Sequence, residues 1–139
     1  MGINLAVLVG VLVVATVVGL MLQRRNGTVR GGRSAEGGWQ LADVAPEPAD
    51  RVLLLQLSSP ICTPCARTRE QLESLAAEHP GVRHVEIDVA DRPHVAKALH
   101  VLRTPTTVAF DRDGTELLRV GGVPRRTDLV AALPLEECR

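Results

Sequence analysis

The sequence predicts an α/β domain preceded by an amino-terminal transmembrane helix. The expected domain has a central mixed sheet flanked by helices, in the order β-α-β-α-β-β-α. Three observations lead to this prediction: an uncharged apolar run opens the chain, strand-like and helix-like segments alternate after it, and an Asp-Gly turn separates the last two strands. The core must be aliphatic, because Trp39 and Phe110 are the only aromatic residues.

The first segment, residues 1–22, contains the run Ile3 to Leu22, which has no charged side chain. About twenty helical residues span roughly 30 Å, the thickness of a bilayer core. We therefore expect an uncleaved, single-pass membrane anchor. A cleaved signal peptide is the alternative, but the run is long, no Lys or Arg precedes it, and no small-x-small cleavage site follows it.

Charge around this segment predicts its orientation. The arginines that follow it closely are Arg24, Arg25, Arg30 and Arg33. Because positive flanks stay in the cytoplasm, the soluble part is expected on the cytoplasmic side, with an extracytoplasmic domain as the alternative. Residues 34–139 carry 12 basic and 16 acidic residues, a net charge of −4, and no basic patch indicates nucleic acid.

Residues 23–38 are rich in Gly and Arg and are predicted to be a flexible linker, so that the domain covers 39–139. Residues 39–44 are apolar enough to pack onto the domain, and 45–50 form a Pro-containing loop. The first strand lies in 51–59. Its apolar residues Val52 to Leu55 do not alternate, which is typical of a central parallel strand covered on both faces.

A helix is predicted from about Thr63 to Glu78, with Pro64 in its first turn and His79, Pro80 and Gly81 ending it. The first parallel crossovers are expected to run through helices. The later elements are a strand at 82–90, a short helix at 92–101, a strand at 106–110, a turn at 111–114, a strand at 115–120 and a helix at 127–133 N-capped by Thr127.

Cys62 and Cys65 lie at the junction of the first strand and the first helix. The unpaired N–H groups and partial positive charge of a helix start favour a thiolate, so Cys62 should be the nucleophile. Cys65, one turn further, can attack a mixed disulfide on Cys62. Zinc is the first alternative, although His79 and His84 do not supply the second ligand pair that zinc sites need. Two inert buried thiols are the second.

Four segments resemble the thioredoxin-like superfamily over about residues 51–133: "RVLLLQLSS", "CTPC", "VEID" and "RTPTTVAFDRDG". The resemblance implies a thioredoxin-like fold whose extra amino-terminal strand and helix are shortened or absent. It also implies that Cys62 attacks and Cys65 resolves. Pro105 matches the cis-proline beside the CxxC, and Thr104 before it would offer its backbone to a substrate strand.

Three positions depart from the family pattern. Ile61 replaces the usual Trp before the first cysteine, Gln56 replaces a buried Asp, and His84 stands where the family has a paired Lys. Glutamine cannot accept a proton near neutral pH, so the proton of Cys65 needs another route. In these departures the chain is more similar to membrane-anchored, specialised members than to the soluble general reductant.

The expected function is that of a membrane-anchored thiol–disulfide oxidoreductase. It would exchange disulfides with a protein partner that carries a disulfide or a dithiol, without a bound cofactor or metal. The alternative, motivated by Gln56, is a redox-inert thioredoxin-like binding module tethered to the membrane. Cys138, next to the carboxyl terminus, is expected to be an exposed, non-catalytic thiol.

Overall fold

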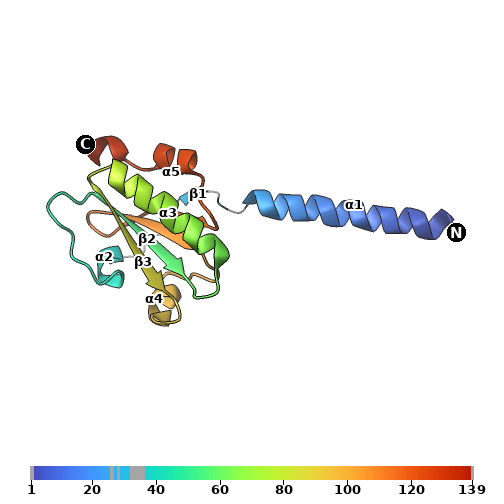
Figure 1. Ribbon diagram of the computed structural model, residues 1–139, viewed down its shortest axis with the longest axis horizontal. Helices are drawn as coiled ribbons and strands as arrows, with labels where there is room; N and C mark the ends of the chain where they lie inside the picture. The colour runs from blue at the N-terminus through green and yellow to red at the C-terminus, as the bar shows by residue number, and fades with distance from the viewer. Residues whose placement is uncertain (1, 26, 28, 32–36, 139) are drawn as a thin grey trace.

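The computed structural model describes residues 2–25, 27, 29–31 and 37–138, and places helices on both faces of a sheet (Figure 1). Within this part, five strands form the sheet in the order β1-β5-β4-β2-β3. The elements are α1 (Gly2–Arg25), β1 (Val29–Gly31), α2 (Gly38–Leu41), β2 (Val52–Ser58), α3 (Thr63–Glu78), β3 (Val82–Asp88), α4 (Pro93–Ala98), β4 (Thr106–Asp111), β5 (Glu116–Gly121), α5 (Arg126–Ala132) and the 3-10 helix η1 (Leu135–Cys138).

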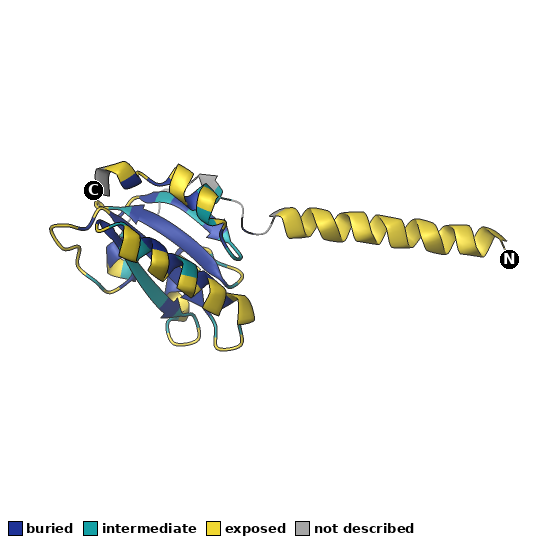
Figure 2. Cartoon of the chain, turned by 45° about the horizontal axis from the view of Figure 1, so that its top comes forward, coloured by how far each residue is buried: buried dark blue, intermediate teal, exposed yellow. Residues whose placement is uncertain are grey.

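Strand β2 is an inner strand of the sheet, between β4 and β3, and all seven of its residues are buried. Its even-numbered residues Val52 and Leu54 join the core under α3 and α5. Its odd-numbered residues Leu53, Leu55 and Leu57 join the core under α2 and α4. The unbroken apolar pattern of this strand is therefore explained by cover on both faces, as predicted, and Figure 2 shows the buried sheet between exposed helix surfaces.

The sheet is mixed, which confirms the predicted fold class. Strand β2 pairs in parallel with β3 and antiparallel with β4, and β4 pairs antiparallel with β5. The expectation of parallel crossovers is correct for β2-α3-β3 and wrong for β3-α4-β4, because β4 runs opposite to its neighbour β2. The last two strands form the hairpin that the Asp-Gly turn predicted.

Helix α3 has the predicted bounds and places the two cysteines. Cys62 is its N-cap and Pro64 lies in its first turn. Its buried residues Cys65, Thr68, Leu72 and Leu75 recur every three or four positions, so one face packs on the sheet. A helix that starts at Thr63 thus turns Cys65 inward and leaves Cys62 at its rim.

Before β2 the structure differs from one sequence expectation and agrees with another. Strand β1 lies inside the range expected to be linker, where it pairs antiparallel with β5. The single turn α2 buries Trp39, as the expected packing of residues 39–44 onto the domain requires. Neither segment has the apolar period of a regular element, so pairing and packing with the rest of the domain must stabilise them. The N-cap assignment of Thr127 is also wrong, because α5 starts at Arg126 and its cap is Arg125.

Helix α1 stands apart from the domain in Figure 1, and its described side chains are exposed. Its 24 residues are long and apolar enough to cross a membrane. At about 1.5 Å per residue the helix is ~36 Å long. The backbone of Cys138 lies in η1, whereas the prediction about its thiol falls outside the described side chains.

Candidate functional site

A disulfide joins Cys62 and Cys65, whose Cα atoms lie 5.4 Å apart. The two sulfurs have different surroundings because the helix begins between them. Cys62, the N-cap, is half-buried at the rim, whereas Cys65 is only 3% exposed. One sulfur can therefore be reached by a large partner and the other cannot, an asymmetry that suits stepwise disulfide exchange.

Gln56 forms a polar layer beneath Cys65, although it is fully buried in the inner strand β2. Its Nε2 donates to the Cys65 carbonyl and to Ser58 Oγ, both at 3.0 Å. Its Oε1 lies 3.0 Å from His84 Nε2. Both ends of the amide are thus satisfied, which a buried polar side chain requires.

Opposite Gln56 on β4, the buried hydroxyl of Thr107 has no hydrogen-bond partner among the described residues.

These contacts determine the orientation of the amide and the tautomer of the histidine. The Cys65 carbonyl can only accept, so the amide nitrogen of Gln56 must face it. The amide oxygen then faces His84 and can also only accept. Nε2 of His84 therefore carries a hydrogen, and Nδ1 is the ring atom that gains or loses a proton.

His84 is partly buried, and this burial is the main reason why its pKa lies below the usual value of 6.5. Glu73 on α3 and Glu86 on β3 raise the pKa, and Arg69 on α3 lowers it. The lowering of the His84 pKa by burial is larger than the net effect of these charges. At neutral pH the layer under Cys65 is therefore uncharged, since Gln56 does not titrate and His84 is mostly neutral.

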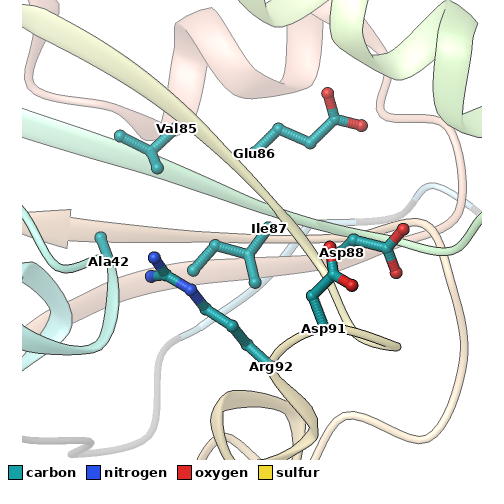
Figure 3. Close-up of a pocket in the computed structure, with 7 residues that line it drawn as sticks. All are labelled: Ala42, Val85, Glu86, Ile87, Asp88, Asp91 and Arg92. Atoms are coloured by element: carbon teal, nitrogen blue, oxygen red, sulfur yellow. The ribbon is translucent and has the colours of Figure 1, made fainter.

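An open groove of about 480 Å³ lies beside the disulfide. The residues that line it are Ser58, Ser59, Pro60, Cys62, Cys65, Ala66, Arg69, Glu86, Asp88 and Asp91. A smaller hollow of about 210 Å³ adjoins it and shares Glu86, Asp88 and Asp91 (Figure 3). Neither cysteine lines the smaller hollow, so the larger groove is the one that borders the two sulfurs.

Arg69 and Glu86 form the wall of the groove as a two-pronged ion pair. Arg69 Nε donates to Glu86 Oε2, and Arg69 Nη2 donates to Glu86 Oε1 at 2.9 Å. The Arg69 hydrogen bond is the largest reason why the pKa of Glu86 is lowered. The parallel register sets Glu86 beside Gln56, hence on the α3 face of the sheet. This pair joins helix α3 to strand β3 next to the cysteines.

The loop before β4 lies against the loop that carries Cys62. The Thr104–Pro105 peptide bond is cis, and Pro105 is buried. Thr104 Oγ1 lies 3.0 Å from Ser59 Oγ, which ties the two loops together. The Pro105 carbonyl accepts from the Gly122 amide at 2.7 Å. Within the described chain, the Thr104 amide and carbonyl make no hydrogen bond to other backbone.

The structure thus brings together all four residues that the sequence singled out, Cys62, Cys65, Thr104 and Pro105. It also places Gln56 and His84 in one hydrogen-bonded chain under Cys65. The sequence did not indicate Glu86, because its position depends on strand register, nor the contact of Ser59 with Thr104.

The depressed pKa of His84 predicts a pH dependence of stability. The unfolded chain takes up a proton on His84 at a higher pH than the folded chain, so stability falls as pH drops below about 6.5. Urea unfolding of the detergent-solubilised chain at pH ~7.5 and ~5.5 measures this fall. His84→Gln should reduce it, whereas the matched control His94→Gln, on exposed α4, should retain it. An equal fall in both variants would contradict the assignment.

Comparison with known proteins agrees with this geometry. A family model described as thioredoxin-like domain matches residues 40–135. Thioredoxin of Chlamydia trachomatis is 32% identical over 82 residues, which cover 59% of this chain and 79% of that protein. Thioredoxin H2 of Arabidopsis thaliana is 29% identical over 92 residues, which cover 66% and 68%.

Among solved structures, a mutant thioredoxin from Halobacterium salinarum superposes with a TM-score of 0.59. It has 26% identity and covers 75% of this chain and 87% of its own. The CxxC disulfide at a helix start, the cis-proline loop beside it and these matches agree with one another. The chain belongs to the thioredoxin-like family.

Proposed function

We propose that this protein is a membrane-anchored thiol–disulfide oxidoreductase of the protein-disulfide reductase type. The difference between a rim cysteine and a buried cysteine at the start of α3 is the observation that carries the proposal. Fold and disulfide support oxidoreductase chemistry in general. The membrane anchoring and the exchange with a protein partner are the additional parts that require experiment.

The reaction starts from the reduced dithiol. The Cys62 thiolate attacks one sulfur of the partner's disulfide, forms a mixed disulfide and releases the other partner sulfur as a thiolate. Cys65 then loses its proton and attacks Cys62, which releases the second partner sulfur. Two electrons pass to the partner, and the Cys62–Cys65 disulfide remains. A second dithiol protein must reduce this disulfide to complete the cycle.

The environment of Cys65 limits the route of its proton. Gln56 contacts the Cys65 carbonyl but cannot act as a base near neutral pH. The partner thiolate released in the first step is a suitable acceptor, because it is basic and forms beside the mixed disulfide. In this scheme the substrate itself removes the proton, and no buried carboxylate is needed.

The loop at Thr104 and Pro105 is the proposed binding surface for the partner's chain. Since the Thr104 amide and carbonyl make no backbone hydrogen bond within the described chain, they are available to an extended substrate segment. The Ser59 contact holds this loop beside Cys62. A substrate strand bound there would run past the exposed sulfur.

Cysteine variants of the full chain in detergent provide the test, with insulin as the disulfide substrate and dithiothreitol as the reductant. Cys62→Ser should lower the catalysed rate at least ~100-fold, because the nucleophile is lost. Pre-reduced Cys65→Ser, freed of dithiothreitol before insulin is added, should accumulate a mixed disulfide with an insulin chain, visible by non-reducing electrophoresis. Cys138→Ser is the control and should retain wild-type turnover. If the reduced wild type does not turn over, the chain is the redox-inert binding module instead.

We also propose that the domain lies on the cytoplasmic side of a cell membrane. Length and composition of α1 support a membrane span, and the arginines that follow it support this orientation. A reducing compartment would then keep the cysteines ready to act as a reductant.

Labelling with a membrane-impermeant maleimide in intact, reductant-treated cells tests this orientation. Cys62, in the Cys65→Ser/Cys138→Ser chain, should be labelled only after lysis. The matched control is Gly2→Cys in a chain without the three native cysteines, which should be labelled in intact cells. Labelling of Cys62 before lysis would place the domain outside and contradict the proposal.

A further inference from the structure

The connection between α1 and the domain is very short. Helix α1 ends at Arg25 and strand β1 begins at Val29, so only three residues separate them. Three extended residues span about 10 Å at most. Because β1 is paired with β5, from Val29↔Val120 to Gly31↔Leu118, the chain joins the sheet directly after leaving the helix.

Gly27 joins this short connection to one loop of the domain. Its amide donates to the Gly121 carbonyl at 2.7 Å. Its φ is +81°, and a Cβ added there would lie 2.2 Å from the Val123 carbonyl oxygen. Only glycine fits this approach without a backbone shift. The chain that leaves α1 is therefore held against residues 121–123.

The same loop, residues 121–123, contacts the redox site through Gly122. The Gly122 amide donates to the Pro105 carbonyl at 2.7 Å, and Thr104 contacts Ser59 in the loop before Cys62. A series of hydrogen-bonded loops thus connects Gly27, two residues after the end of α1, to the loop of the exposed cysteine. In Figure 1, α1 leaves the domain on the side where α3 begins.

Two apolar side chains project from the same end of the domain. Ile61 and Leu102 are each 98% exposed, far more than any other large apolar side chain described in the domain. They lie on the two loops that the Ser59–Thr104 contact joins. Large apolar side chains that are exposed close together indicate an interaction surface. A bound partner or a membrane would shield these side chains from water.

We propose that the redox face, made up of Ile61, Cys62, Leu102, Thr104 and Pro105, is held at the membrane surface and acts on integral membrane proteins. The partner's disulfide or dithiol would lie within a few residues of its own membrane span. This proposal rests on the proposed redox function and on α1 as the membrane span. A freely swinging domain would instead reach soluble and membrane partners alike.

Fluorescence quenching tests the geometry without any enzymatic activity. A dye on Cys62, in the full-length Cys65→Ser/Cys138→Ser chain, is read in phosphatidylcholine vesicles that contain a lipid with a nitroxide-labelled headgroup. Strong quenching is expected. A dye on Ala77→Cys, in a chain without native cysteines, is the matched control. Residue 77 is exposed near the other end of the ~24 Å helix α3, so this dye should be quenched less.

Two variants release the redox face from the membrane. A flexible Gly-Ser segment of about twelve residues between Arg25 and Asn26 adds a tether of ~20 Å and leaves β1 in place. Gly27→Val removes the close approach to residues 121–123. Both should reduce quenching at Cys62, whereas the same segment appended after Arg139 should not. If dyes at Cys62 and at position 77 are quenched equally in chains whose tether is unmodified, the proposal is overturned.

Exchange rates test the partner class. Transmembrane peptides in the same vesicles carry a disulfide either next to the apolar segment or beyond a long Gly-Ser spacer. The wild type should favour the near disulfide at least ~10-fold, and the lengthened tether should remove this preference. Equal rates for the wild type would overturn the proposal. If insulin is not reduced either, the redox function fails, and quenching still decides the geometry.

Discussion

The start of helix α3 at the end of strand β2 is the constraint on which the site depends. All seven residues of β2 are buried, so the strand cannot shift without moving both cores. The helix that follows must begin at Thr63 to turn its apolar face inward. Cys62 is thereby left at the rim as the N-cap of the helix, and Cys65 is directed into the domain. The chemical difference between two identical residues follows from this packing.

The polar layer under Cys65 is neutral, because Gln56 does not titrate and the pKa of His84 is lowered. Gln56 holds the Cys65 carbonyl, and His84 satisfies the other end of the amide. Among the described residues no carboxylate is hydrogen-bonded to Cys65, which leaves the helix start as the proposed source of acidity for the pair. In the proposed membrane-anchored state, the short connection after α1 would add a second restriction, because it would limit where the exposed sulfur can meet a partner.

Much of this arrangement could be predicted from the sequence. The unbroken apolar run of β2, the helix at 63–78 and the cysteine spacing are local patterns, and local patterns predict local structure. Strand β1 could not be predicted, because three residues in a Gly/Arg-rich stretch become a strand only through pairing with β5. The position of Glu86 depends on register, and the α5 cap at Arg125 depends on how the preceding loop enters the helix. These features arise from tertiary contacts that no short segment encodes.

The central claim is that the helix start makes Cys62 the reactive thiol. The pH dependence of iodoacetamide alkylation in the reduced full chain, with the modified residue identified by mass spectrometry, tests it most directly. The predicted result is that Cys62 is alkylated with a pKa clearly below the ordinary ~8.5 of a free thiol, while Cys65 remains unmodified. Alkylation of Cys62 with a pKa at or above that value, or equal alkylation of both cysteines, would contradict the claim.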